Sequence, residues 1–204
     1  VGQLVDATKD FTDAYTSGDT EKAKALYPLA RQHYERIEPT AESFGIKEAG
    51  DLDGALDARV QDLSADAGKK PNDPEVLADW TGWHRIEADL FTDKSEGYEF
   101  ESGAERKKVA DKLNEDTKTL YDLVYGKVDG ASGTFELKLS DVATGASALL
   151  EEVALSKIGG EEETFSHTDL FDFHANVEGA EVAYGNVEKL VEAQDPELAK
   201  KITT

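Results

Sequence analysis

Apolar residues recur every three or four positions at the start of the chain, which is the spacing of an amphipathic helix. The first helix is predicted over residues 4–15, and one face of it carries Leu4, Thr8, Phe11 and Tyr15. Gly18 follows as a helix stop, and Asp19 is suited to cap the start of the next helix. A second helix is therefore expected to begin at Thr20.

This second helix is predicted over residues 20–44, although two prolines, Pro28 and Pro39, interrupt it. Its apolar stripe consists of Ala23, Leu26, Ala30, Ile37, Ala41 and Phe44. A proline has no backbone N–H, so Pro39 leaves the carbonyl of Glu35 without its usual helical donor. We expect the helix to bend at this point.

The helical spacing weakens over residues 45–72, where glycines and acidic residues accumulate. This stretch is predicted to be a long ordered loop with one helical turn around residues 53–63. A strong helix start follows, with Asp73 as the N-cap and Pro74 at the first helical position. The third helix is expected to reach residue 92 and to bury Leu77, Trp80, His84, Ala88 and Phe91.

The fourth helix is predicted over residues 102–125, because Ser102 and Glu105 have the spacing of a capping box. Residues 134–140 then alternate like a short strand, but no second strand is evident to pair with it. A fifth helix, over residues 140–158, is apolar nearly all round and is therefore expected to be central. Two glycines at 159 and 160 end it.

A sixth helix is predicted to begin within the sequence SHTD at residues 166–169. Its inward residues are expected to be Leu170, Phe173, Val177, Tyr184, Val187 and Leu190. Asp195 and Pro196 start one more short helix just before the last residues. These elements together predict an all-α fold in a single domain over residues 1–204.

The composition is that of a globular protein, with 39% hydrophobic and 32% charged residues in a chain of 204. Cysteine is absent, which excludes disulfides, thiolate metal sites and thiol catalysis. No apolar run reaches the length of a membrane span, so no direct insertion into a membrane is expected. Because position 1 is not methionine, we expect a processed or engineered start, with any signal peptide already removed.

The charge balance is strongly negative, with 44 acidic against 22 basic residues and a formal net charge of −22. Such a surface repels phosphate backbones and anionic membranes, so nucleic acid is not an expected partner. Cations are attracted instead. The alternative interpretation is that most of these acidic residues only confer solubility or salt tolerance.

His84 and Glu87 form the first candidate pair for chemistry. Residues three apart share one face of a helix, so the imidazole and the carboxylate can reach a single ion. The face also carries Trp80, Ala88 and Phe91, which predicts that the pair points into the protein. With so many acidic residues, a His-x-x-acid pair also arises by chance, and a buried histidine bonded to a neighbouring glutamate is the competing interpretation.

Glu35 and Glu38 form a second pair with the same spacing, beside the predicted bend. Taken alone, such a pair is usually a solvated helix face. Two helices that each offer an inward pair, however, resemble the plan of carboxylate-bridged iron sites in helix bundles. Asp53 and Asp57 could add oxygen ligands, or could be ordinary capping acids. Oxygen ligands with one imidazole suit iron, manganese, calcium or, less well, zinc.

The other histidines are weaker candidates for metal ligands, and the motifs of other reaction classes are not found. His33 is expected to be a surface or packing residue, His167 a capping neighbour, and His174 could face either way. The helix motif of zinc proteases, a glycine-rich phosphate loop and a Gly-x-Ser-x-Gly elbow are all absent.

Four sequence blocks resemble the imelysin-like domain of the EfeO-type iron-uptake family. They are HYERIEP at 33–39, LDGALDAR at 52–59, GWHRIE at 82–87 and LLEEVALSKIGGEEETFSHTDLFDFHANVEGA at 149–180. They occur in the family's order and span nearly the whole chain. The resemblance implies an all-helical domain of two packed four-helix-bundle-like halves, at about 1–125 and 126–204, with the second half truncated at its C-terminus.

The resemblance also implies a function. Proteins of this family work outside the cytoplasm, in the periplasm or at the cell surface, with a membrane permease and a haem peroxidase-like partner. The implied role is to capture iron, ferric or ferrous, with zinc or another divalent cation as the alternative. The implied ligands are His84, Glu87, Glu35, Glu38, Asp57 and Glu151, the last chosen over Glu152.

The chain departs from the family pattern in two respects, and two other functions compete with iron binding. A cupredoxin-like domain, which precedes many family members, is not seen, and the last helices of the second half are expected to be missing. The first rival is an enzyme, either an imelysin-like metallopeptidase or a di-iron oxidase, although no spare base is evident. The second is a binder of acidic polysaccharides or metal chelates, with Trp80, Trp83 and Tyr98 lining a groove. We expect a binding protein and not an enzyme.

Overall fold

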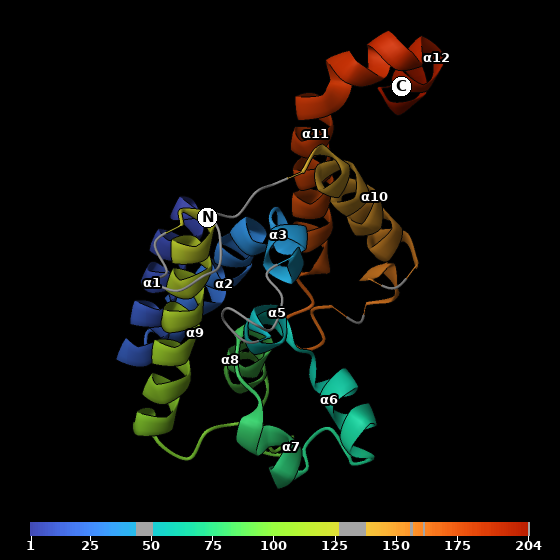
Figure 1. Cartoon of the computed structure of the whole chain (residues 1–204). Helices are drawn as coiled ribbons and strands as arrows, with labels where there is room; N and C mark the ends of the chain where they lie inside the picture. The colour runs from blue at the N-terminus through green and yellow to red at the C-terminus, as the bar shows by residue number, and fades with distance from the viewer. Residues whose placement is uncertain (44–50, 127–137, 156, 161, 204) are drawn as a thin grey trace.

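The computed structural model describes all residues except 44–50, 127–137, 156, 161 and 204. Within the described part every regular element is helical and no strand occurs, which confirms the all-α prediction (Figure 1). The elements are α1 Gly2–Ser17, α2 Thr20–Glu35, α3 Glu38–Ser43, α5 Leu52–Asp57, α6 Val60–Ala67, α7 Pro74–Asp79, α8 Trp83–Phe91, α9 Gly103–Val124, α10 Leu139–Leu155, the 3-10 turn η1 Lys157–Gly159, α11 Asp169–Gln194 and α12 Pro196–Ile202.

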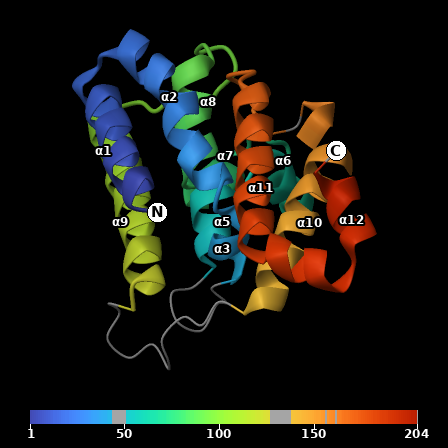
Figure 2. The same cartoon turned by 90° about the horizontal axis from the view of Figure 1, so that it is seen from above.

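The main core lies among α1, α2, α8 and α9, where α1 contacts both α2 and α9 (Figure 2). At its centre the ring of Phe11 lies 5.6 Å from the rings of both Tyr27 and Trp83. All three side chains are fully buried, and each such burial contributes roughly 1.5–3 kcal/mol to stability. This core fixes the position of α2 and α8, which carry the candidate ligands.

The start and stop signals that the sequence offers near α1, α2, α9 and α12 are confirmed. Gly18 has a left-handed conformation at the end of α1, and the Asp19 carboxylate accepts the N–H of Lys22 at the start of α2. Ser102 and Glu105 form the complete capping box of α9, and Asp195 caps α12. Local capping chemistry thus determines these boundaries.

The bend expected at Pro39 is a break between α2, which ends at Glu35, and α3, which begins at Glu38. The carbonyl of Glu35 accepts a hydrogen bond at 3.1 Å from the side-chain amide of Asn176 on α11. A buried carbonyl must find a donor, and here a distant helix supplies it. The predicted last residue of the second helix, Phe44, lies outside the described residues.

The prediction of a long loop over residues 45–72 is wrong for its described part, which contains α5 and α6. The Asp51 side chain accepts the N–H of Gly54 to cap α5, and Gly68 ends α6 in a left-handed conformation. Leu52, Leu56 and Val60 are buried. Both helices are too short to show a periodic stripe, which explains why the pattern did not reveal them.

The single third helix predicted over residues 73–92 is also wrong, because it is broken between α7 and α8. Gly82 has a φ of +86°, and a Cβ at this position would overlap the backbone carbonyl of Leu56. The break brings α8 close against the end of α5. Contacts from a different part of the chain therefore interrupt this helix.

Replacing Gly82 by alanine is expected to destabilise the protein by about 3 kcal/mol or more, because it adds both left-handed strain and a clash. Gly18→Ala is the matched control: Gly18 has a φ of +83°, and no atom lies within 4 Å of its added Cβ. That control should lose only about 1–2 kcal/mol. Urea denaturation of both variants measures the difference, and equal losses would contradict a close approach at Leu56.

The expectation that the fifth helix is central is wrong. The corresponding helix, α10, lies at the edge of the fold and contacts α3, α11 and η1 (Figure 1). Leu155 is 77% exposed and Leu150 is 44% exposed, whereas Leu149 is buried. An evenly apolar helix has no preferred face, so its hydrophobicity alone did not determine its position.

The inward face predicted for the sixth helix is wrong at three positions. Leu170, Val177 and Leu190 are exposed on α11, while Val187 is buried. The buried face of α11 carries Asp172, Ala175, Asn176 and Ala180. Two of these four residues are polar, because this face borders a cluster of charged side chains. The alternation at 134–140 lies mostly outside the described residues, and Leu139 already belongs to α10.

Candidate metal centre

His84 lies in the first turn of α8, directly after the break at Gly82, and its side chain is 2% exposed. Its Nδ1 is 3.0 Å from Oε2 of Glu87, one turn further along the helix. The other oxygen of Glu87 accepts the backbone N–H groups of Phe165 and Ser166, at 2.8 and 2.7 Å. Glu87 is thereby fixed, and it orients the imidazole ring.

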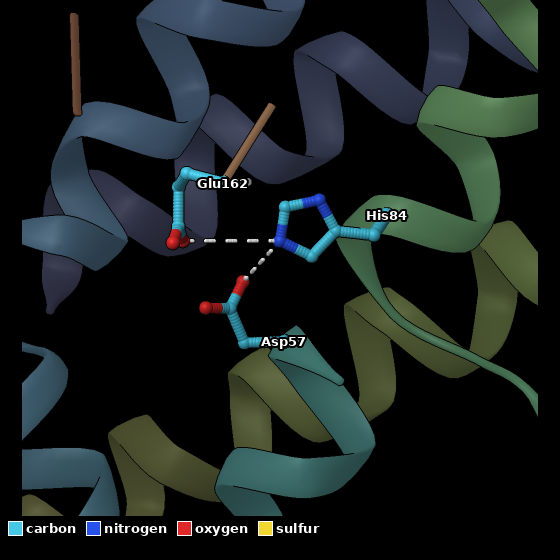
Figure 3. A group of neighbouring side chains, drawn as sticks. All are labelled: Asp57, His84 and Glu162. Atoms are coloured by element: carbon cyan, nitrogen blue, oxygen red, sulfur yellow. Dashed lines mark ion pairs between the residues drawn. The ribbon is translucent and has the colours of Figure 1, made fainter. Parts of the chain in front are cut away.

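The second ring nitrogen of His84 is directed toward two more carboxylates. Nε2 lies 3.5 Å from Oδ1 of Asp57 on α5 and 4.0 Å from Oε1 of Glu162 (Figure 3). It makes no hydrogen bond to any residue that the structure describes. Burial, followed by the nearby Arg31 guanidinium, lowers the pKa of His84 to about 4. The imidazole is therefore neutral at physiological pH. In the tautomer that donates Nδ1–H to Glu87, the Nε2 lone pair is available to a cation.

Arg31, on α2, occupies the middle of the cluster with its side chain fully buried. Its guanidinium pairs with the carboxylates of Glu35, Asp57, Glu162, Glu163 and Asp172. It pairs closely with Asp57 and Glu35, and it lies 2.6 Å from Glu163 and 2.9 Å from Glu162. This one cation therefore links acidic residues from α2, α5, α11 and the segment that precedes α11.

Lys157, in the turn η1, lies on the side of the cluster where Glu35 and Glu38 are found. Its ammonium is fully buried, 2.9 Å from Glu38, 3.0 Å from Glu35 and 3.5 Å from Oε1 of Glu162. The carboxylate of Glu152 is 3.9 Å away. Because Arg31 and Lys157 share both Glu35 and Glu162, the two cations belong to one charge network.

Among the described residues, carboxylates outnumber cations in this network. The buried acidic side chains are Glu35, Glu38, Asp57, Glu87, Glu162, Glu163 and Asp172. They face the buried cations Arg31 and Lys157, and Arg59, which is 27% exposed, pairs with Glu162 at 2.8 Å. Such an excess of negative charge attracts a further cation.

The pKa values reflect this excess. Burial and the neighbouring Glu35 raise the pKa of Glu38, and burial and Glu87 raise that of Glu163, both well above the ordinary range. Burial raises the pKa of Glu87 to about 7, although its backbone hydrogen bonds oppose the change. Some of these carboxyl groups therefore hold protons at neutral pH, and an incoming cation can take the place of those protons.

The structure brings together most of the acidic residues that were predicted from the sequence as metal ligands. Asp57 and Glu87 flank His84, whereas Glu35 and Glu38 lie in the same cluster but on its Lys157 side. Glu151 is exposed on α10 and is not part of the cluster, while its neighbour Glu152 faces Lys157. The choice of Glu151 over Glu152 is thus not favoured by the structure.

Sequence reasoning missed Glu162, Glu163, Asp172 and Lys157. The only signal was the acidic run that follows Gly160, within the block quoted at 149–180. His174 is an exposed residue on α11, its side chain 66% accessible. The groove considered for a polysaccharide binder does not form from its two tryptophans, because Trp80 and Trp83 are both buried in the core.

Among the residues that the structure describes, two groups of three side chains are close enough to hold an ion, and both include His84. One comprises Asp57, His84 and Glu162, and the other His84, Glu87 and Glu163; in each, the ligand atoms lie within 4.8 Å of one another and are buried. One nitrogen with several carboxylate oxygens suits iron or manganese, and less well zinc. A neutral buried imidazole without a hydrogen-bond partner at Nε2 is the feature that best fits a metal ligand.

Known proteins with similar sequences point to one family. The family model described as imelysin, of peptidase group M75, matches residues 1–204. The iron uptake system component EfeO of Escherichia coli O1:K1 is 45% identical over 202 residues, which is 98% of this chain and 46% of that protein. EfeO of E. coli K12 and of Shigella flexneri are 44% identical over the same lengths. The chain spans about half the length of these relatives.

Proposed function

Because the chain belongs to the imelysin family, we propose that it captures iron at the carboxylate cluster around His84 and serves an iron-uptake system. The observation that carries the proposal is the buried Nε2 of His84, which faces Asp57 and Glu162 and has no hydrogen-bond partner in the described part of the chain. A buried polar atom without a partner costs free energy, and a bound ion removes that cost.

The proposed ligands come from both sides of the imidazole. Nε2 of His84 supplies the nitrogen, and Asp57 and Glu162 supply oxygens. Glu87 fixes the ring through Nδ1, as a carboxylate does behind many metal-bound histidines. Glu163 extends the cluster on that side. The carboxylates outnumber the buried cations, which favours a small, highly charged ion such as iron.

Binding, and not hydrolysis, is the proposed activity, despite the peptidase name of the family. A metallopeptidase must present an open metal position to a peptide bond. His84 is 2% exposed, and Glu87 and Glu163 are fully buried, so a peptide has no access to them in this conformation. Casein incubated with the iron-loaded protein is expected to remain intact, and cleavage that a chelator abolishes would favour the peptidase.

The proposal also covers where the chain acts and which proteins it works with. Relatives of more than twice this length are named as components of an iron uptake system. We propose that this chain acts outside the cytoplasm, in the periplasm or at the cell surface, and transfers iron to a membrane permease alongside a haem peroxidase-like partner. No helix in the described part of the chain is long and apolar enough to cross a membrane.

Crystals soaked in iron and measured at the iron absorption edge test the site directly. The expected result is an anomalous peak within about 2.0–2.3 Å of Nε2 of His84. A soak in magnesium, which prefers oxygen ligands alone, serves as the comparison for non-specific binding to acidic residues. Peaks confined to exposed carboxylates, with none in the cluster, would contradict the proposal.

A further inference from the structure

A buried lysine is paired with the same acidic residues that an iron ion would use. The ammonium of Lys157 lies within 3.5 Å of Glu35, Glu38 and Glu162, and its side chain is fully buried. Oε1 of Glu162 is shared, since it lies 2.9 Å from Arg31, 3.5 Å from Lys157 and 4.0 Å from His84. An ion bound to this oxygen therefore lies close to the ammonium, which it repels.

The two buried cations are anchored differently. Arg31 projects from the middle of α2, a helix held by the main core, and its planar guanidinium makes five ion pairs. Lys157 projects from a three-residue turn on a flexible four-carbon stem. Of the two, Lys157 can leave the cluster with less disturbance of the fold.

The turn that carries Lys157 is itself exposed. Ile158 is 69% exposed, and a Cβ added at Gly159 or Gly160 would meet no atom of the described residues within 4 Å. Gly160 has a φ of +82°, a conformation that glycine adopts without strain. The turn can therefore shift outward without breaking core contacts.

We propose that the ammonium of Lys157 is an internal counter-cation that an incoming iron ion displaces from Glu35, Glu38 and Glu162. This inference rests on the proposed function and assigns a role to the turn η1. Without iron, Lys157 neutralises part of the cluster and keeps it folded. With iron bound, the ion takes over that charge, the ammonium moves to solvent, and Glu35 and Glu38 become available as oxygen ligands.

Acetylation of lysines in the wild-type protein, followed by mass spectrometry, tests the displacement. An N-hydroxysuccinimide acetate reagent is applied with and without ferric citrate, and bound iron is measured in the same samples. Lys118, which is 65% exposed, reports the rate for an accessible lysine. Lys157 is expected to be protected without iron and to react at about the rate of Lys118 once iron is bound.

The outcomes separate this inference from the proposed function. If iron binds and Lys157 stays protected from acetylation, the proposed displacement is wrong, but the proposed iron capture still holds. A protein that binds no iron in the cluster would overturn both. Protection that is lost equally with citrate alone would show that iron is not the cause, and would also overturn the displacement.

A substitution at Lys157 provides the second measurement. Lys157→Gln keeps a hydrogen-bond donor but removes the competing charge, so iron affinity is expected to rise on the order of tenfold. Lys118→Gln, at an exposed pair with Asp122, should leave the affinity unchanged. A lower affinity in a folded Lys157→Gln protein would mean that the ammonium supports binding, which contradicts displacement. If this variant does not fold, the acetylation of the wild-type protein still decides.

Discussion

Replacing His84 by alanine is expected to lower the affinity for iron by about a hundredfold or more, because it removes the proposed nitrogen ligand. The remaining ligands are carboxylates that already pair with Arg31 or accept hydrogen bonds. Competition with a coloured iron chelator measures the change. Circular dichroism establishes that the variant is folded.

His174→Ala is the matched control, because this imidazole is exposed on α11 and lies outside the cluster. It should bind iron like the wild-type protein. Glu162→Gln is expected to lower the affinity by about tenfold, because it keeps the shape of the side chain and removes one charged oxygen ligand. Equal affinities in the wild type, His84→Ala and Glu162→Gln would rule out the assignment of the site.

Replacing Arg31 by methionine is expected to destabilise the iron-free protein by about 3–5 kcal/mol, the cost of breaking a buried ion pair by removing one partner. Methionine fills similar space, but it leaves the carboxylates of Glu35, Asp57 and Glu163 without their central cation. Urea denaturation in the presence of a chelator measures this loss.

Arg36→Met provides the comparison for Arg31. Arg36 pairs with Glu178 at 2.6 Å, but both side chains are about one-third exposed, so this pair should contribute no more than about 1 kcal/mol. Similar losses in the two variants would mean that Arg31 does not organise the cluster. A larger stabilisation of the Arg31→Met protein by iron is also expected, since the ion supplies the missing charge.

Features of the fold that depend on neighbouring residues in the sequence could be predicted. The stop at Gly18, the caps at Asp19 and Asp195, and the capping box of α9 each depend on residues within one turn. The break at Gly82 could not be predicted, because it depends on the carbonyl of Leu56 in another element. Periodicity cannot detect such a contact.

The site could also be predicted only in part, because sequence spacing reveals residues that share one helix face but not contacts between distant elements. The spacing of His84 and Glu87 indicated that both point inward, and both are buried. Glu162 and Asp172 could not be distinguished among 44 acidic residues. Asp172 lies on a face of α11 that a hydrophobic pattern assigns to solvent, yet it is buried there beside the guanidinium of Arg31, on α2, and the side chain of Glu163. That the chain divides into two halves remains a prediction.

The cluster joins two distant stretches of sequence. Its members before residue 90 are Arg31, Glu35, Glu38, Asp57, His84 and Glu87, and those after residue 156 are Lys157, Glu162, Glu163 and Asp172. An ion held between these stretches acts as a removable cross-link, so its binding free energy adds to the stability of the fold. Release of the proposed iron ion should then loosen this region of the fold. A partner that withdraws the ion would receive it from a protein that opens as the ion leaves.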